Sequence, residues 1–263
     1  VEVNTSTLDD KVLWKRADEL PTYHLANIVD DHLMEITHVI RGEEWISSVP
    51  KHIALFKACG FKVPKYAHTP QVMKIDEEDG TKRKLSKRKD PEASVSFYTE
   101  SGYPKESVIE YLLTIANSNF EDWRKVNKDA PQSAFPFNLK KMSASGALFD
   151  LNKLNDVSKN VISLMTAEEV YEKALAWAKA YDNELYELFV ADEAFAKGIL
   201  SIDRGTAKPR KDIAKWDEIK DYVSFFYNSL YTPDHTLPEN ISKEDAAAIL
   251  EAYIKVFDAD DDK

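Results

Sequence analysis

The chain has 263 residues and a formal net charge of −11, from 35 Lys and Arg against 46 Asp and Glu. Its one cysteine, Cys59, excludes a disulfide framework and a multi-cysteine zinc site, and it fits the reducing conditions of the cytoplasm. Its apolar segments are shorter than the roughly 18 residues that a membrane span needs, and neither a G-x-G-x-x-G nor a Walker A motif is present. The negative net charge leaves nucleic-acid binding open, because local basic patches decide it.

Residues 1–92 alternate strand-like and helix-like segments. The expected strands cover residues 12–14, 36–40 and 71–75, and the expected helices cover residues 23–34 and 49–60, with a polar turn at 76–80. A proline near the start of the second helix and a glycine after its end support its bounds. Cys59 lies on that apolar helix, so we expect it in the core. The alternation predicts part of an open α/β sheet.

Beyond residue 92 the pattern changes to helices. Apolar side chains recur at helical spacing, which predicts helices over residues 104–116, 151–165, 166–177, 184–200, 211–228 and 242–257. Thr166 and Glu169 have the spacing of a capping box at the start of the third of these helices. We therefore expect an α/β region over residues 1–92 and an all-helical region after it.

The most basic segment of this acidic chain is residues 82–89, K-R-K-L-S-K-R-K, in which six of eight residues are cationic. Charge alone favours a solvated loop. The order of residues favours a binding role, because Lys84 and Lys87 lie three apart around the hydroxyl of Ser86. Mobile lysines and backbone N–H groups suit a triphosphate whose charge moves onto a leaving pyrophosphate.

Several segments resemble the bacterial glutamyl-tRNA synthetases, which belong to the class I aminoacyl-tRNA synthetases. Residues 84–88, K-L-S-K-R, are similar to the glutamyl variant of the K-M-S-K-S signature of that class. Residues 20–34 resemble the P-T-Y-H-x-A-x-V-V-D-D-x-x-M segment, and residues 37–45 match T-H-V-I-R-G-E-E-W. Residues 141–154 resemble the entry to the helical part that contacts tRNA. The resemblance covers nearly the whole chain.

The resemblance also implies a domain organisation. Residues 1–92 would be the second half of a Rossmann-like catalytic domain, residues 93–160 a helical region that contacts the tRNA stem, and residues 161–263 a truncated, helical anticodon-binding region. The H-[IL]-G-H signature of the other catalytic half and the acceptor-end-binding insertion are absent from the sequence. We therefore expect an internal fragment of a longer enzyme that is inactive alone.

The resemblance implies that Tyr23, Asn27 and Arg41 bind glutamate. Tyr23 and Asn27 are four residues apart, so they share one face of a helix. Arg41 follows a predicted strand, where α/β sheets bind ligands, and a guanidinium can hold a carboxylate with two hydrogen bonds. The alternatives are a packed tyrosine on a helix surface and a salt bridge from Arg41 to a neighbouring carboxylate.

The implied ATP-binding residues are Glu44, Trp45, Lys84, Ser86, Lys87 and Arg88. Glu44 and Trp45 would contact the adenosine, although a core tryptophan is the alternative for Trp45. Lys84 and Lys87 would be the catalytic cations that contact the phosphates, with Ser86 and Arg88 shaping the loop. Magnesium would come with ATP and be held mostly by phosphates and water, and no zinc is expected.

The carboxylates and histidines of residues 30–38 invite a metal-site interpretation. No H-E-x-x-H motif or cysteine pair supports it, so capping and hydrogen bonding are the favoured roles, and we expect no protein metal site. The sequence K-M-S at 141–143 resembles the signature in its letters, but alanine replaces the second lysine. We assign His235 no role.

Basic residues of the helical region are candidates for contacts with the tRNA backbone, and a solvated surface is the alternative for each. These residues are Lys140, Lys141, Lys208, Arg210 and Lys211.

We interpret the chain as a fragment of a cytoplasmic, monomeric glutamyl-tRNA synthetase, which ligates L-glutamate to tRNA-Glu through glutamyl-adenylate with ATP. The alternative is a non-catalytic tRNA-binding or regulatory module derived from a synthetase. A synthetase-like enzyme that modifies a tRNA base is disfavoured by the long helical extension after Phe149. A glutaminyl-tRNA synthetase is disfavoured because its anticodon domains are rich in β-structure.

Overall fold

The structure is a computed structural model that describes residues 8–76, 78–142, 146–233, 236–238 and 240–257. Two compact units divide the chain, Val1–Ile219 and Lys220–Lys263. The first unit contains an α/β region and a helical region, and the second contains one long helix. No helix in the described ranges is long and apolar enough to cross a lipid bilayer.

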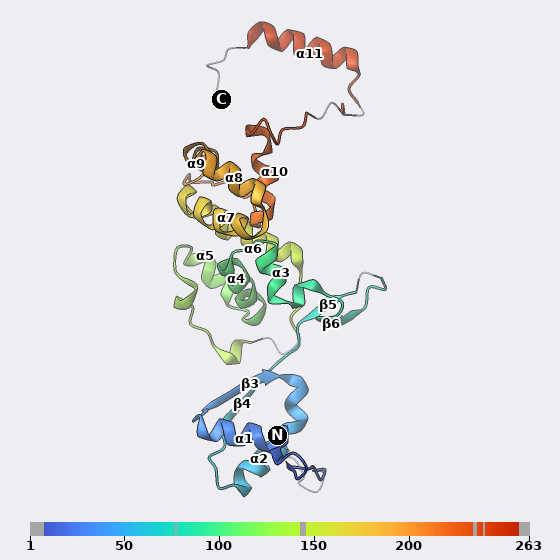
Figure 1. Ribbon diagram of the computed structural model, residues 1–263, viewed down its shortest axis with the longest axis vertical. Coiled ribbons are helices and arrows are strands. Elements are labelled where there is room, and N and C mark those ends of the chain that lie inside the picture. The colour runs from blue at the N-terminus through green and yellow to red at the C-terminus, as the bar shows by residue number, and fades with distance from the viewer. Residues whose placement is uncertain (1–7, 77, 143–145, 234–235, 239, 258–263) are drawn as a thin grey trace. The chain divides into compact units, whose positions relative to one another are not determined.

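The α/β region is built around one parallel pair of strands (Figure 1). It contains β1 (Trp14–Lys15), β2 (Leu20–Pro21), α1 (Tyr23–Leu33), β3 (His38–Gly42), α2 (Val49–Ala58) and β4 (Lys65–Thr69). β3 and β4 run parallel, in register from His38 opposite Lys65 to Gly42 opposite Thr69. α2 forms the crossover between them, as a parallel connection requires, and it also packs against α1.

The remaining strands do not extend this pair into a larger sheet. Among the described residues β1 pairs only with β2, and β5 (Met73–Ile75) pairs antiparallel with β6 (Lys82–Lys84). The second side of β5 is occupied, because Met73 N–H donates to Ala147 O at 2.8 Å and Phe149 N–H donates to Met73 O at 2.7 Å. The predicted strand–helix alternation is present, but the sheet is smaller than an open α/β sheet.

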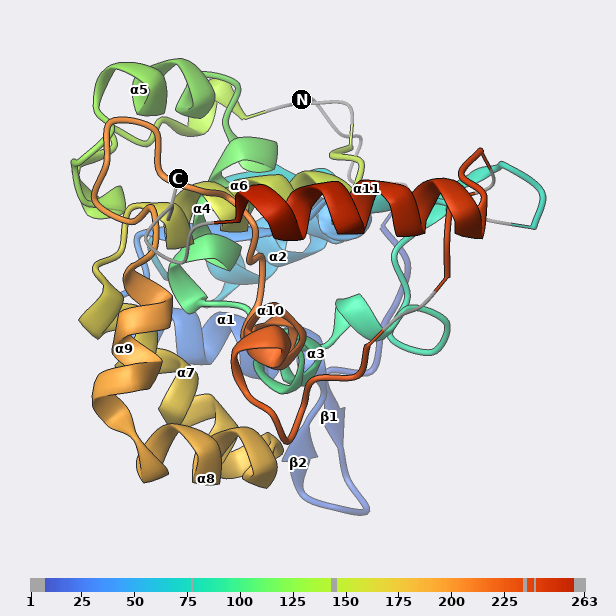
Figure 2. The same ribbon diagram turned by 90° about the horizontal axis from the view of Figure 1, so that it is seen from above.

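The helical region packs around aromatic side chains. Its helices are α3 (Val95–Glu100), α4 (Lys105–Ala116), α5 (Phe120–Val126), α6 (Leu151–Ser163), α7 (Ala167–Tyr181), α8 (Asn183–Ala191) and α9 (Glu193–Ser201). α4 packs on α6 over a core of Tyr103, Tyr111, Phe149 and Leu154. α7 contacts α8 and α9, and these three helices lie together in two perpendicular views (Figures 1 and 2).

Short 3-10 segments join several of these elements. They are η2 (Glu43–Ser48), η3 (Pro91–Ala93), η4 (Gln132–Ala134), η5 (Leu139–Lys141), η6 (Trp216–Glu218) and η7 (Ser224–Phe226).

Side-chain caps define the helix ends and correct two expectations. The capping box is confirmed, since Thr166 Oγ1 accepts from Glu169 N and Glu169 accepts from Thr166 N. The single helix expected over residues 184–200 is wrong. Asp192 starts α9 by accepting a hydrogen bond from Phe195 N at 2.9 Å, and α8 ends before it.

The helix expected over residues 211–228 is also wrong, because that segment contains only η6, α10 (Ile219–Val223) and η7. Helical hydrogen bonding cannot begin at Ala214, whose backbone is bound to side chains. Ala214 O accepts from Ser158 Oγ at 2.5 Å, and Ala214 N donates to Glu218 Oε2 at 2.7 Å.

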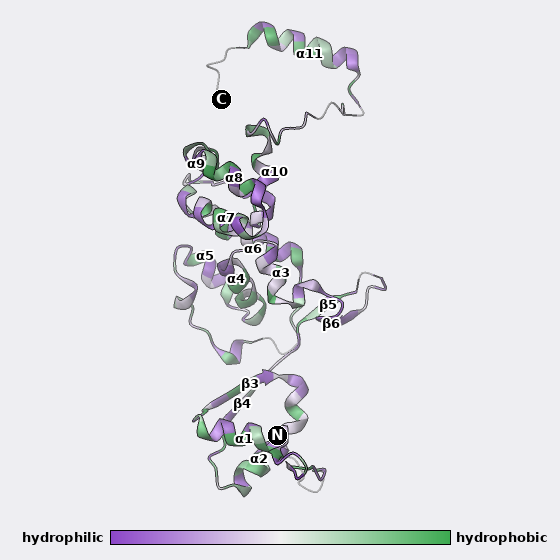
Figure 3. Ribbon diagram, in the orientation of Figure 1, coloured by the Kyte–Doolittle hydropathy of each residue, from purple (hydrophilic) through white to green (hydrophobic). Residues whose placement is uncertain are grey.

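The second unit contains α11 (Lys243–Val256), which begins where Ser242 Oγ accepts from Asp245 N at 3.1 Å. Figure 3 shows hydrophobic and hydrophilic residues alternating along this helix. Its apolar side chains are exposed, with Ile254 at 72% and Leu250 at 59%.

The turn after α3 depends on a glycine. Gly102 has a φ of +79°, and a Cβ there would lie 2.8 Å from Trp216 Cβ and 2.9 Å from Trp216 N. We expect Gly102→Ala to lower the free energy of unfolding by at least about 2 kcal/mol, because it adds a left-handed backbone penalty to a clash with backbone. The measurement is urea denaturation of the chain.

Gly198→Ala is the matched control, because that glycine lies within α9 and a Cβ there would have no neighbour within 4 Å. We expect this variant to raise the free energy of unfolding by up to about 1 kcal/mol. Equal effects of the two substitutions would contradict the analysis.

Candidate functional site

A guanidinium at the end of β3 is held by imidazoles and a carbonyl. Arg41 Nε donates to His68 Nε2 at 3.3 Å, and Arg41 Nη2 donates to Trp45 O at 3.3 Å. Arg41 Nη1 lies 3.2 Å from Nδ1 of His52. The alternative of a salt bridge is wrong for the described residues, in which no ion pair joins Arg41 to Asp30, Asp31 or Glu43. The charge of Arg41 is therefore available to an anionic ligand.

The histidine behind this arginine is fully buried. His52 lies on α2, and its Nε2 is 2.9 Å from Nδ1 of His24 on α1. Burial, with the nearby Arg41 guanidinium as second cause, lowers the pKa of His52 to about 4. A guanidinium only donates, so Nδ1 of His52 is the acceptor and its Nε2 carries the proton that is donated to His24. His52 thus holds Arg41 as a neutral base.

Aromatic rings surround the same guanidinium. Arg41 Cζ lies 5.1 Å from the ring centroid of Tyr66 and 5.8 Å from that of Trp45. The rings of Tyr23 and Trp45 are 5.1 Å apart between centroids. Trp45 is half-buried and not a fully enclosed core residue. The structure thus brings together Tyr23, Arg41 and Trp45, which the sequence analysis selected separately.

Two buried polar atoms near Arg41 lack hydrogen-bond partners among the described residues, Oδ2 of Asp31 and the hydroxyl of Tyr66. Burial raises the pKa of both groups, against the opposing effect of Arg41. An unpartnered buried polar atom costs about 1–3 kcal/mol, which a polar ligand that pairs with it would recover. Asn27 is half-buried on α1, one turn after Tyr23.

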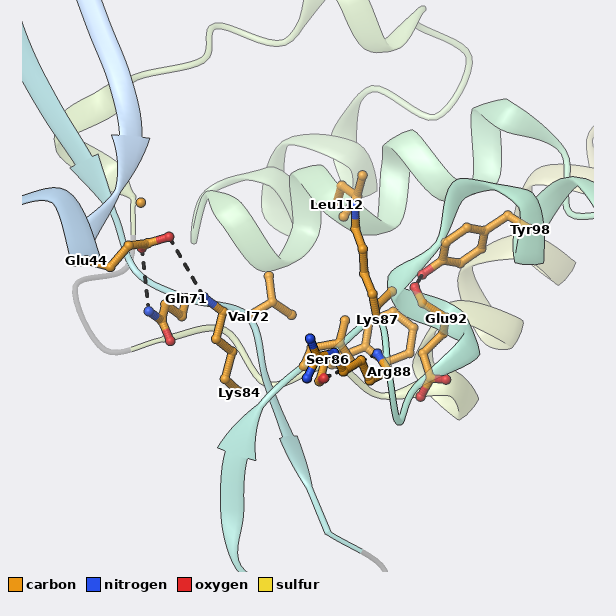
Figure 4. Close-up of a pocket in the computed structure, with 14 residues that line it drawn as sticks. Glu44, Gln71, Val72, Lys84, Ser86, Lys87, Arg88, Glu92, Tyr98 and Leu112 are labelled. Carbon is orange, nitrogen blue, oxygen red and sulfur yellow. Dashed lines mark hydrogen bonds and ion pairs between the residues drawn. The ribbon is translucent and has the colours of Figure 1, made fainter. Parts of the chain in front are cut away.

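A second group of residues surrounds the basic loop that follows β6. Lys84 Nζ lies 3.8 Å from Glu44 Oε1, and Gln71 Nε2 donates to Glu44 Oε2 at 3.5 Å. These residues border an open pocket of about 780 Å³ (Figure 4). The pocket is lined by Gly42, Glu44, Gln71, Val72, Lys84, Leu85, Ser86, Lys87, Arg88, Glu92, Ala93, Tyr98, Leu112 and Phe149. Five of the six residues predicted to bind ATP therefore share one pocket, and Trp45 adjoins it in sequence.

The candidate tRNA contacts lie apart from this pocket. Lys140 and Lys141 are exposed on η5, and Lys208, Arg210 and Lys211 are exposed in the loop after α9. Arg210 forms an ion pair with Asp212 at 2.5 Å.

Some further expectations have other outcomes. Cys59 is exposed at the end of α2, which corrects its expected place in the core, because the apolar face of α2 turns His52 and Phe56 inward instead. Ser143 of the K-M-S sequence and His235 lie outside the described residues. The described residues contain no group of three or more His, Cys, Asp or Glu that could hold a metal ion.

The sequence analysis missed His24, His52 and His68. Each lies on a different element, α1, α2 and β4, so no local spacing connects them with Arg41. The only sequence signal is that His52 occupies an apolar helix face.

Comparisons with known proteins agree with this geometry. A sequence profile described as tRNA synthetases class I (E and Q), catalytic domain, matches residues 1–156. The chain belongs to this class I family. It is 52% identical to a glutamate–tRNA ligase of Clostridium perfringens over 97% of the chain and 47% of that protein. It is 47% identical to a glutamate–tRNA ligase of Sorangium cellulosum, again over 97% of the chain and 47% of the relative.

A solved structure supports the same relationship. The glutamate tRNA ligase of Elizabethkingia meningosepticum, in complex with its amino acid, is 30% identical, with a TM-score of 0.65. The match covers 97% of this chain and 51% of that one. This member of the class I family thus spans about half the length of the relatives it matches.

The buried histidine makes the stability of the chain depend on pH. The pKa of His52 is about 4 in the folded chain and 6.5 in the reference state, so the unfolded chain binds more protons between these values. The contribution is complete above about pH 6.5 and is lost as the pH falls towards 4. We expect it to remove about 2 kcal/mol between pH 7.5 and pH 5.

The measurement is urea denaturation at both pH values for the native chain and for His52→Gln, whose pH dependence should be smaller by that amount. His38→Gln is the control, because His38 is exposed on β3. An unchanged pH dependence in His52→Gln would refute the assignment.

Proposed function

We propose that the chain is part of a glutamate–tRNA ligase and supplies the phosphate-binding loop and part of the glutamate pocket. The observation that carries the proposal is the juxtaposition of Lys84, Ser86, Lys87 and Arg88 with Glu44 in one pocket. Glu44 adjoins Trp45, whose ring and carbonyl contact Arg41. The family profile and the identities to glutamate–tRNA ligases support it.

The proposed reaction has two steps. In the first, a carboxylate oxygen of glutamate attacks the α-phosphorus of ATP, the bond to the bridging oxygen breaks, and pyrophosphate leaves with the bonding electrons. In the second, a hydroxyl at the 3′ end of tRNA-Glu attacks the activated carbonyl, AMP leaves, and the hydroxyl proton is lost. Side chains act here by positioning and by electrostatic stabilisation and form no covalent bond.

Arg41 would hold a carboxylate of the amino acid. Its guanidinium is oriented by His52 and His68 and has no carboxylate partner among the described residues. Tyr23 and Asn27 would orient the amino acid without adding charge. Glu44 and Trp45 would contact the adenosine, the first by accepting hydrogen bonds and the second by stacking.

Lys84 and Lys87 would stabilise the charge that develops on pyrophosphate, with Ser86 and Arg88 completing the loop. Magnesium would neutralise phosphate charge when it is bound with ATP. The pocket lining offers the carboxylates of Glu44 and Glu92, too few for a protein-made site, so phosphates and water would supply most ligands.

We extend the proposal to the rest of the chain. Residues 1–92 would belong to the catalytic domain, residues 93–160 would contact the tRNA stem, and residues 161–263 would belong to the anticodon-binding region. The exposed residues Lys140, Lys141, Lys208, Arg210 and Lys211 would contact the tRNA backbone. The complete ligase would be a cytoplasmic monomer.

The second candidate is a non-catalytic tRNA-binding or regulatory module, which the partial coverage of the relatives favours. The two candidates differ in ATP binding. Salt-dependent tRNA binding by the chain without any ATP binding would support the module.

We expect no adenylate formation by the 263-residue chain alone, because it carries only part of the ATP site. The measurement is a single-turnover activation assay with ATP, glutamate and tRNA, with the Clostridium perfringens ligase as positive control. Adenylate formation at the rate of that ligase would contradict the expectation.

We expect Lys87→Ala in the full-length ligase that carries this chain to lower the rate of activation by about 100- to 1,000-fold, because a pre-organised charge is removed from the transition state. Lys82→Ala is the matched control, since Lys82 is an exposed cation of the same basic segment that does not line the pocket. Equal rates for the two variants would refute the role of Lys87.

A further inference from the structure

A buried carboxylate lies beneath the basic loop. Asp90, whose side chain is 1% exposed, accepts from Arg83 Nη1 at 2.6 Å and from Arg83 Nη2 at 2.8 Å. It also accepts from the backbone N–H of Ser86 at 2.8 Å. Lys74 Nζ on β5 lies 3.6 Å from its second oxygen. One carboxylate thus connects β5, β6 and the middle of the K-L-S-K-R segment.

The charges around Asp90 are closely balanced. Arg83 is also bound by Asp76 at 2.5 Å, and Lys74 also forms an ion pair with Glu92. The hydrogen bonds from Arg83, reinforced by Ser86 N–H and Lys74, hold the pKa of Asp90 well below its usual range in spite of burial. A buried ion is tolerated where such partners surround it, and removing one partner leaves an uncompensated charge.

The same carboxylate closes a turn. Asp90 N–H donates to Ser86 O at 2.8 Å, while Ser86 N–H donates to the Asp90 side chain, so the two residues bind each other in both directions. Lys87 and Arg88 lie inside this turn, are exposed, and make no ion pair with any described residue. Figure 4 shows both side chains among the residues that line the pocket.

We propose that Asp90, with Arg83 as its fixed partner, is a positioning residue for the phosphate-binding loop. It fixes the turn from Ser86 to Asp90, so that Lys84, Lys87 and the Ser86 segment face a triphosphate without first losing conformational freedom. This inference rests on the proposed function for its ligand, whereas the fixed turn itself does not. Asp90 touches no substrate in this account and acts only through the loop.

The sign of one substitution separates positioning from simple electrostatics. Asp90→Asn keeps the size of the side chain and removes a negative charge near the bound anion. If Asp90 acted only through its charge, its removal would strengthen anion binding. If it positions the loop, its removal weakens anion binding, because the turn is no longer closed by a charge-assisted hydrogen bond.

The binding experiment measures the affinity of the chain for inorganic tripolyphosphate by calorimetry. We expect Asp90→Asn to weaken binding by about tenfold, the loss typical of one charge-assisted hydrogen bond. Glu78→Gln is the matched control, because it removes the same charge from an exposed position of the same hairpin. Tighter binding by both variants would overturn the inference.

A second readout needs no ligand. We expect amide exchange at Ser86 and trypsin cleavage after Lys87 or Arg88 to be about tenfold faster in Asp90→Asn than in the native chain, at equal resistance to urea. Unchanged exchange and cleavage would overturn the inference. Faster exchange in a chain that binds no tripolyphosphate would support the fixed turn and refute the phosphate-binding function, so the two failures are distinguishable.

Arg83→Lys is a second variant for the case in which Asp90→Asn unfolds. It keeps the charge and loses the paired N–H groups of the guanidinium. We expect the same direction of change in amide exchange and in binding, with a smaller size. No change in either measurement would overturn the inference.

Discussion

An acidic chain that binds anions must keep a few cations away from its own carboxylates. Here the carboxylates nearest to the basic loop are bound to other cations, because Asp76 and Asp90 hold Arg83 while Glu92 holds Lys74. Lys87 and Arg88 are left without ion pairs among the described residues. The excess of negative charge over the whole chain therefore does not determine the charge of the pocket.

Arg41 reaches the same state by a different route. Its neighbours are a neutral histidine, a second imidazole, a carbonyl and the faces of two aromatic rings. These groups orient the guanidinium without neutralising it. Both candidate ligand-binding regions thus combine firm positioning of a cation with the absence of a carboxylate partner in the described structure, which is what electrostatic stabilisation requires.

The sequence predicts the parts of this arrangement that depend on local patterns. The capping box at Thr166, the helix that begins at Tyr23 and the basic segment around Ser86 follow from neighbouring residues. It does not predict the contact of His52 with Arg41, which joins α2 to β3 through tertiary packing. It also misses the break at Asp192, where a side-chain cap overrides a continuous apolar pattern.

The pairing of Arg83 with Asp90 joins two positions that lie seven residues apart in the sequence. Neither side chain can change alone without leaving the other charge buried and unpaired. Over evolutionary time, substitutions at these two positions should therefore occur together, whereas exposed neighbours such as Lys82 drift independently. The hairpin would thus carry its history as correlated exchanges beneath the loop and uncorrelated exchanges on its outer surface.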